Sequence, residues 1–276
     1  MSITDLPRKY PILTFLILVY LLSSPILATS ILKIPFELLV VYASWTPNIA
    51  AFIVLGLVLR EKGGITRLIS GWKKWRTGTK WYLAAFSPLV IALLGVAIYL
   101  ILRGGYSPPN QPVFGQILLL IVFAVITGAT GEELGWRGFL LPRLQTRFNP
   151  LVSTILVGVV WALWHLPLWL IPGSVWQESI PYGAFALITI SSSFLYTWVV
   201  NNTDGSMLMA FIIHFTMNFV SNVVVLLGLI SLGELYNLSA ILYTVYAALI
   251  ILVFKPSMVK GGTSLMPAQE QEGFSD

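Results

Sequence analysis

VFGQILLLIVFAVITGATGEELGWRGF, residues 113–139, is the stretch that decides the fold class of this 276-residue chain. Between residues 113 and 129 the only polar side chains are Gln116 and Thr127. A helix needs about 20 predominantly apolar residues to cross the hydrocarbon core of a bilayer. The stretch therefore predicts a membrane-spanning helix that runs directly into a charged sequence.

That charged sequence places Glu132 and Glu133 side by side, with Arg137 one helical turn later. Removing an ionised carboxylate from water is costly unless a partner compensates for the lost hydration, so such groups within spans are functional hypotheses by default. Glu133 and Arg137 are four residues apart and share a helix face, which predicts an ion pair. Glu132 points to a different side of the helix and remains available for another role.

The composition excludes a soluble protein. Hydrophobic residues make up 57% of the chain and charged residues only 10%, with a mean hydropathy of +0.85, whereas soluble domains carry roughly 25% charged residues. The chain has no cysteine, which excludes thiolate nucleophiles, cysteine-ligated zinc and disulfides. The net charge of +5 comes from Lys and Arg in certain loops, so we expect membrane topology as its cause and no nucleic-acid partner.

Apolar stretches of membrane-spanning length recur along the whole chain. Each is bounded by proline, glycine, asparagine or charged residues, which interrupt helices or favour loops. We therefore expect an all-α integral membrane protein, a bundle of about eight transmembrane helices. The stretches lie near residues 11–32, 36–59, 81–102, 112–131, 151–171, 181–200, 206–230 and 235–254.

The basic residues alternate between the two sides of this predicted bundle. One side holds only Lys33 and Arg103, and the other holds the remaining fourteen of the sixteen Lys and Arg residues. Cytoplasmic loops of membrane proteins carry the excess of Lys and Arg. This asymmetry predicts a multi-pass protein of the cell membrane with both termini in the cytoplasm and an even number of spans.

The only two histidines, His165 and His214, both lie inside apolar spans. Asn218 follows His214 by four residues and shares its helix face. If the helix with Glu132 turns back at Asn149, Glu132 lies 17 residues before the turn and His165 lies 16 after it. In an antiparallel pair both would then stand about 25 Å from the turn, at similar depth.

Each of these features also has an ordinary structural explanation. Acids and an Arg at the end of a span can serve as an interfacial anchor, and a single His in a span is more often a packing residue. Two histidines, an asparagine and a carboxylate pair at internal positions of three spans together favour one shared polar site.

The ordered motifs resemble the CPBP or Abi family of intramembrane proteases, which includes the type II CAAX prenyl endopeptidases. The family's Glu-Glu-x-x-x-Arg motif stands at residues 132–137, and its His-x-x-x-Asn motif stands at residues 214–218. The remaining motif, an aromatic residue four positions before His, stands at residues 161–165, with Trp161 where the family more often has Phe. The resemblance covers about residues 120–222 by motif.

The resemblance implies a bundle of eight helices with a cytoplasm-facing cavity and hydrolysis by a glutamate-type mechanism. Glu132 would act as general base on a water molecule that His165 helps to position. His214 and Asn218 would stabilise the oxyanion. A base near the attacking water and donors aimed at the developing charge are what amide hydrolysis needs.

By the same resemblance, Glu133 and Arg137 would have structural or orienting roles. Residues 1–260 would form one polytopic protease domain with a motif core at 120–222, and residues 261–276 a disordered cytoplasmic tail. The implied partners are the lipid bilayer and a membrane-tethered peptide or protein substrate, which is prenylated in some members of the family.

Two alternatives stay open. Glu132, His165 and His214 could bind Zn²⁺ with a water at the fourth position, although the chain lacks a His-Glu-x-x-His sequence, and we favour a mechanism without a metal or other cofactor. The protein could also be a non-enzymatic membrane immunity or interaction protein, or a proton-coupled transporter that uses the same buried Glu and His residues.

Overall fold

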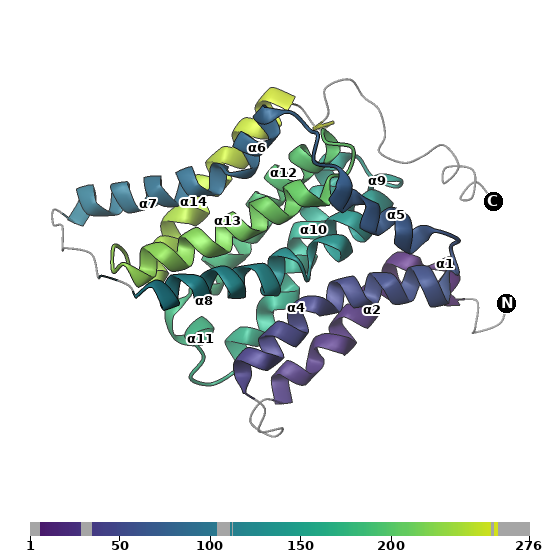
Figure 1. Cartoon of the computed structure of the whole chain (residues 1–276), viewed down its shortest axis with the longest axis horizontal. Helices are drawn as coiled ribbons and strands as arrows, with labels where there is room; N and C mark the ends of the chain where they lie inside the picture. Colours follow the sequence, from purple (N-terminus) through teal and green to yellow (C-terminus); the bar gives the residue numbers. More distant parts are fainter. Residues whose placement is uncertain (1–5, 29–34, 104–110, 112, 255–256, 259–276) are drawn as a thin grey trace.

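The computed structural model describes residues 6–28, 35–103, 111, 113–254 and 257–258. Every regular element within these ranges is a helix (Figure 1). The α-helices, in chain order, are α1 (Leu6–Lys9), α2 (Pro11–Ser23), α4 (Phe36–Ile53), α5 (Gly64–Ser70), α6 (Thr79–Ala85), α7 (Ser87–Arg103), α8 (Phe114–Ala124), α9 (Leu141–Gln145), α10 (Pro150–His165), α11 (Val175–Ser179), α12 (Tyr182–Asn201), α13 (Met207–Leu226) and α14 (Leu232–Phe254).

Within the described ranges, six helical segments are long and apolar enough to cross a membrane, and the bent pair α6–α7 provides a seventh if it counts as one span. Each of the eight predicted stretches coincides with an apolar helix. The first of them, Pro11–Leu27, is shorter than the six. The prediction of an all-α membrane protein is confirmed, whereas the number of eight spans stays a prediction. The predicted tail, residues 261–276, lies outside the described residues.

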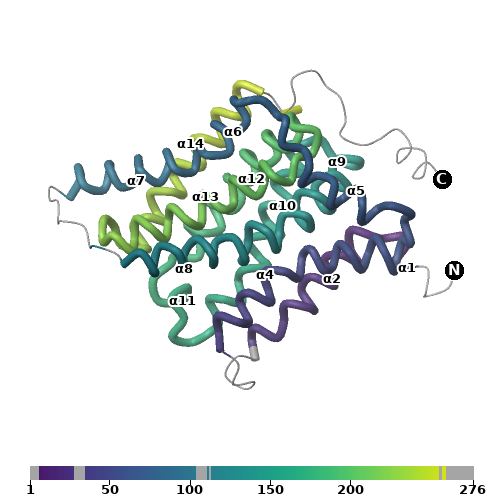
Figure 2. Tube along the Cα trace, in the orientation of Figure 1, coloured from purple at the N-terminus to yellow at the C-terminus, as the bar shows by residue number. Residues whose placement is uncertain are grey.

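The helices form a layered bundle with α10, α12 and α13 near its middle (Figure 2). Helix α12 packs against both α10 and α14, α7 packs against α13 and α14, and α2 packs against α4. Small residues allow the closest approach: a Cβ added to Gly158 on α10 would lie 2.7 Å from the Cα of Ile190 on α12. Such close contacts are typical of helix packing inside membranes.

One end of the bundle gathers the basic loops, and we call it the basic end. Arg8 donates to the carbonyl oxygen of Val58, Arg143 pairs with Glu61, and the hydroxyl of Ser206 donates to the carbonyl oxygen of Lys74. These contacts join α1 and α9 to the segment that follows α4, and the start of α13 to the loop between α5 and α6. In Figure 1 this end lies at the upper right.

The opposite end, which we call the Arg103 end, holds the last residue of α7 and the first turn of α14. Arg103 forms an ion pair with Glu234 there. The short helix α11 belongs to the same end, at the lower left in Figure 1, and the hydroxyl of Ser174 ties its start to the carbonyl oxygen of Leu168. Charge thus divides the described part of the bundle into two unequal ends.

The longest segment, Phe114–Gln145, is interrupted in the middle. Thr127 and Gly128 leave helical geometry, and Gly128 has φ 55° and ψ −73°. This conformation is close to a γ-turn that residues with a side chain adopt only under strain. The break lies inside one wide π-helical turn, Val125–Ala129, and a second one, Leu134–Leu140, follows the two glutamates. Such turns occur frequently at functional sites.

Helix α4 supports this interruption from the side. Asn48 donates from its amide nitrogen to the carbonyl oxygen of Thr130 and accepts from the backbone N–H of Gly135, at 2.7 and 3.0 Å. Trp45 donates to the carbonyl oxygen of Ile126. A break inside a membrane frees backbone groups that must find partners within the protein, and these two side chains are such partners.

Candidate active site

The predicted ion pair between Glu133 and Arg137 is present, with Arg137 Nη1 3.1 Å from Glu133 Oε1. Both side chains are buried, at 0% and 1% exposure. The guanidinium lies between the rings of Trp161 and Tyr196, 4.1 and 3.8 Å from their centroids. Stacking on aromatic faces stabilises a desolvated guanidinium, so this arrangement holds the cation rigidly beneath the site.

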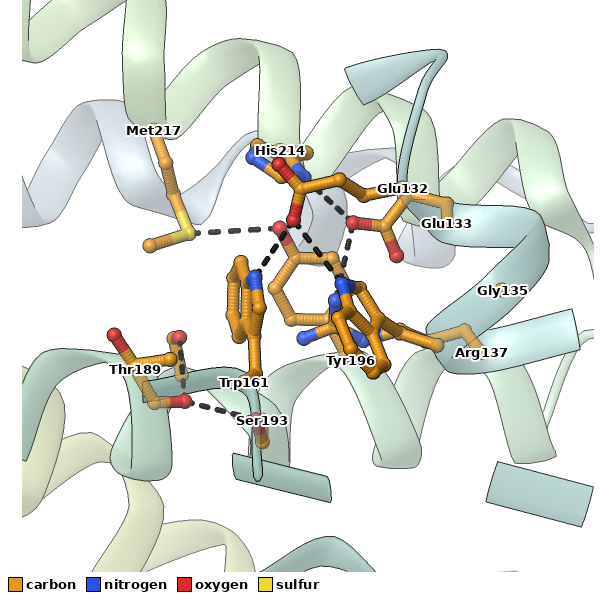
Figure 3. A network of polar contacts seen from close by, with 12 residues as sticks. Glu132, Glu133, Gly135, Arg137, Trp161, Thr189, Ser193, Tyr196, His214 and Met217 are labelled. Carbon is orange, nitrogen blue, oxygen red and sulfur yellow. Dashed lines mark hydrogen bonds and ion pairs between the residues drawn. The ribbon is translucent and has the colours of Figure 1, made fainter. Parts of the chain in front are cut away.

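Glu133 has a second partner, His214, whose Nδ1 lies 2.6 Å from the same Oε1 atom (Figure 3). A carboxylate that pairs with a buried arginine accepts hydrogen bonds, so the Nδ1–H of His214 donates to it. The contact leaves Nε2 as the imidazole nitrogen that faces away from the carboxylate. Sequence spacing did not predict this contact, because it joins two different helices.

Glu132 has different partners from its neighbour. Its Oε2 atom accepts hydrogen bonds from the indole nitrogens of Trp161, at 2.7 Å, and Trp136, at 3.1 Å. Both donors are neutral and come from the two helices that the sequence places on either side of the Asn149 turn. In the described part of the chain, the other oxygen of Glu132 accepts no hydrogen bond that competes with a substrate or water.

His165 lies one helical turn beyond Trp161. Its Nδ1–H donates to the carbonyl oxygen of Trp161 at 2.9 Å, which fixes the tautomer with Nε2 as the acceptor. Trp164 and Phe185 contact the ring, with centroid separations of 4.6 and 4.9 Å. Trp161 therefore links the two predicted residues, because its indole binds Glu132 and its carbonyl binds His165.

Gly128 marks the point where His214 and Asn218 converge. A Cβ added there would lie 2.4 Å from His214 Nε2 and 3.1 Å from Asn218 Nδ2. Both nitrogens therefore reach the same small space beside the backbone break. That space is where the oxygen of a substrate carbonyl would be able to accept hydrogen bonds from both side chains.

These groups share one cavity of about 600 Å³. Its lining contains all four residues predicted to be catalytic, Glu132, His165, His214 and Asn218. Glu133 and Arg137 are not among the lining residues and lie behind the wall, where they hold His214. Most of the wall is aromatic or aliphatic, with rings from Trp161, Trp164, Trp176, Phe185, Tyr236 and Tyr243.

The position of the cavity shows that two expectations from the sequence are incompatible. Its lining continues from Glu132 to Phe36, Ser174 and Leu232, which lie at the Arg103 end. The sequence predicted a cavity that faces the cytoplasm and basic loops that lie in the cytoplasm. Both cannot hold, because the cavity extends away from the basic loops. The family resemblance carried the first expectation, and the charges of this chain carry the second.

The metal alternative finds no matching geometry. Among the residues that the structure describes, no three His, Asp or Glu side chains are grouped so that they could hold a metal ion. Glu132 and His165 instead each use one donor or acceptor atom in contacts with Trp161. Zinc binding by Glu132, His165 and His214 would require these side chains to rearrange, and the absence of a cofactor stays a prediction.

Three residues of the site escaped the sequence analysis. Asn48 and Gly128 shape the break, and Trp136 holds Glu132. Asn48 had a usable signal, since an asparagine next to a proline inside an apolar span calls for a polar partner. Gly128 and Trp136 had none, because glycine and tryptophan are common in membrane helices.

Two comparisons with known proteins match the part of the chain that carries the site. Residues 114–220 match the model of the family described as type II CAAX prenyl endopeptidase Rce1-like. The curated CAAX prenyl protease 2 of Methanococcus maripaludis is 34% identical over 120 residues, which cover 42% of this chain and 42% of that protein. The match thus spans less than half of the relative's length. The part of the chain that carries the site, residues 114–220, is therefore similar to the Rce1-like type II CAAX prenyl endopeptidases.

Proposed function

We propose that this protein is an intramembrane endopeptidase that hydrolyses a peptide bond of a membrane-associated substrate. The observation that carries the proposal is the convergence of a buried carboxylate and two nitrogen donors on one cavity. Glu132 lies on one wall, and His214 and Asn218 lie beside the Gly128 break. The similarity of residues 114–220 to a family of endopeptidases supports the same reaction class.

In this proposal Glu132 removes a proton from a water molecule while the water oxygen attacks the substrate carbonyl carbon. His165 accepts a hydrogen bond from that water through Nε2, the nitrogen that its contact with Trp161 leaves available. The proton then passes from Glu132 to the leaving nitrogen as the C–N bond breaks. The products are a carboxylic acid and an amine, so atoms and charge balance.

The oxyanion that forms during attack needs donors that are already in place. Asn218 supplies an amide N–H, and His214 supplies Nε2–H when its imidazole is protonated. Glu133 accepts from the opposite nitrogen of the same ring and stabilises its positive charge. A buried carboxylate has the same orienting effect on the histidine of a serine protease. Glu133 therefore acts through His214 and does not touch the substrate.

The proposal also covers how the chain is arranged in the membrane. We propose a multi-pass protein of the cell membrane with eight crossing helices, in which α2 with its following turn and the bent pair α6–α7 each count as one. Both termini lie in the cytoplasm, because the basic end contains α1 and the loops rich in Lys and Arg. The name of the curated relative makes a prenylated, membrane-tethered peptide one candidate substrate.

The test uses purified full-length protein in lipid vesicles with a library of membrane-tethered peptides. Each peptide is offered with and without a prenyl group, and products are read by mass spectrometry. We expect wild-type protein to cleave and Glu132→Gln to lose cleavage. Glu178→Gln, a change at an exposed acid on α11, is the matched control and is expected to cleave normally. Cleavage that persists in Glu132→Gln would refute the assigned mechanism.

A proton-coupled transporter remains the contrasting class, because Glu and His residues inside a membrane also suit proton transfer. The position of Asn218 favours hydrolysis. Its amide reaches the same space as His214 Nε2, and an amide that neither gains nor loses protons serves an oxyanion better than a proton path. The same vesicles, loaded with a pH-sensitive dye, would reveal proton transport directly.

A further inference from the structure

The cavity extends toward one end of the bundle, and helix α13 shows this most clearly. This helix begins next to Ser206 at the basic end. Its cavity-lining residues start at His214 and continue through Asn218 to Asn222, so none lies in the first turn and a half. The open space therefore begins near the middle of the helix and extends toward the Arg103 end.

Two further helices repeat this pattern. On α4 the lining runs from Phe36 to Ser44, within the half that starts at the Arg103 end. On α14 it runs from Leu232 to Tyr243, again from the same end. Since three helices from different parts of the chain agree, the direction belongs to the bundle as a whole.

Between the site and the basic end the bundle is packed. Phe139, Tyr196, Met209 and Ile213 are fully buried at 0% exposure. Phe139, Met209 and Ile213 lie on the basic-end side of Arg137 and His214, and Tyr196 packs against the Arg137 guanidinium. The Glu133–Arg137 ion pair therefore closes the cavity on this side. Protein interiors of this kind leave no passage for a peptide. Access from the basic end would require the core to open.

Loops rich in Lys and Arg stay in the cytoplasm, which places the basic end inside the cell and the cavity mouth outside. We propose that the site takes its substrate from the extracytoplasmic side. The substrate is then the extracytoplasmic juxtamembrane segment of a membrane-anchored polypeptide, not a cytoplasmic tail. This inference rests on the proposed peptidase function for the nature of the occupant, but the side of the opening is independent of it.

The mouth suits a segment at the level of the outer headgroups. Trp169 contacts Trp176 and Tyr182 there, with ring centroids 5.2 and 5.0 Å apart. Tryptophan and tyrosine gather at membrane interfaces, where one end of each ring is apolar and the other is wet. An apolar peptide that leaves the outer leaflet would meet these rings before it reaches Glu132.

Because the chain has no cysteine, single cysteines can report the side of each end. Val175 lines the cavity and is 49% exposed on α11, and Thr146 is exposed at the basic end. Full-length Val175→Cys and Thr146→Cys proteins are treated in intact cells with a membrane-impermeant maleimide that carries polyethylene glycol. We expect Val175→Cys to be labelled in intact cells and Thr146→Cys only after the membrane is permeabilised.

The reverse pattern, with labelling of Thr146→Cys alone in intact cells, would overturn the proposal. Glu178→Cys, also exposed on α11, repeats the outer measurement if Val175→Cys does not accumulate. Labelling reads topology and does not depend on proteolysis. A failure of the proposed peptidase function and a failure of the access side therefore give different results.

A functional comparison closes the test. The polyethylene glycol adduct at residue 175 is expected to lower cleavage of a tethered peptide relative to the same variant before labelling. The adduct at residue 146 is expected to leave its own variant unchanged. Equal cleavage before and after labelling at residue 175 would show that substrate does not pass α11, and would overturn the proposal.

Discussion

At the scale of single residues, the two adjacent carboxylates differ in the charge of their partners. Glu133 binds a buried guanidinium and an imidazole, so protonating it would leave Arg137 without its counter-ion in a low-dielectric interior. Glu132 binds two neutral indole N–H groups, which lose much less when the carboxylate is protonated. Of the two carboxylates, Glu132 is therefore the better suited to the general-base role that we propose.

The indole contacts of Glu132 lead to the first prediction. Trp161→Phe keeps an aromatic ring beside Arg137 but removes the 2.7 Å donor to Glu132. We expect kcat to fall by about 10- to 100-fold with little change in KM, because a misplaced base costs rate and not binding. Trp198→Phe is the control, since its buried indole nitrogen has no hydrogen-bond partner among the described residues. An equal loss in both variants would contradict the prediction.

Gly128 provides the second prediction. A methyl group there would occupy the space that His214 Nε2 and Asn218 Nδ2 share, at a backbone angle of φ 55° that disfavours any side chain. We expect Gly128→Ala to lose cleavage by at least about 100-fold, as removal of an oxyanion donor does. Gly115→Ala, on the same segment with open space around it, should retain activity in the same peptide assay.

The residue scale also shows which contacts a sequence can predict. The Glu133–Arg137 pair was predicted because both residues lie on one helix, where a spacing of four fixes their neighbourhood. The contact between Glu133 and His214 was not, because it depends on how two helices cross. Likewise the spacing placed His165 and Glu132 at similar depth, but it did not show that Trp161 contacts both of them.

At the scale of elements, the interruption of Phe114–Gln145 is the feature that builds the site. A continuous α-helix would turn Glu132 and Glu133 to positions set by 3.6 residues per turn. The break at Gly128 and the π-helical turns instead place the two acids on separate partners. Asn48 stabilises this geometry from α4 through one donated and one accepted hydrogen bond.

The third prediction concerns this support. Asn48→Leu keeps the volume but leaves the carbonyl oxygen of Thr130 and the N–H of Gly135 without partners. Each unsatisfied buried group costs about 1–3 kcal/mol, so the thermal midpoint in detergent should fall together with activity. Asn48→Asp keeps the acceptor for Gly135 but loses the donor to Thr130 and buries a carboxylate, so it should be destabilised as well. Unchanged stability of Asn48→Leu would show that the break is held by other contacts.

The positions of the elements were largely predictable, and their irregularities were not. Apolar length locates spans because the bilayer sets a fixed thickness, and all eight stretches coincide with helices. The break at Gly128 and the bend between α6 and α7 depend on what packs beside them. A glycine in an apolar run is compatible with a straight helix as well as with a turn.

At the scale of the whole molecule, basic side chains and aromatic rings gather together at the basic end. Arg76 lies 4.9 Å from the ring of Trp75, and Lys80 lies 4.9 Å from the ring of Trp81. Basic side chains at this level attract anionic headgroups. The sequence predicted this asymmetry from its charges, whereas the expectation of a cytoplasm-facing cavity came from the family resemblance, and the lining residues place the cavity toward the Arg103 end.

The fourth prediction follows from this surface. The thermal midpoint of the protein should be higher in vesicles with anionic lipid than in neutral vesicles, and salt should reduce the difference because it screens exposed charges. Replacement of Lys73, Arg76 and Lys80 by Gln should reduce it further. Arg103→Gln, at the opposite end, is the matched control. A lipid effect that is unchanged in the triple variant would place the anionic contacts elsewhere.

The support of the broken segment by α4 has a consequence for biosynthesis. Chains are made and inserted from the N-terminus, so Asn48 is in the bilayer before Gly128 and the two glutamates arrive. A segment with freed backbone groups and two acids would enter lipid poorly by itself. When this segment is inserted, Asn48 on α4 is already present to bind its backbone groups. His214, the second hydrogen-bond partner of Glu133, follows much later in translation. The order of synthesis is therefore Asn48 first, the two glutamates second and His214 last.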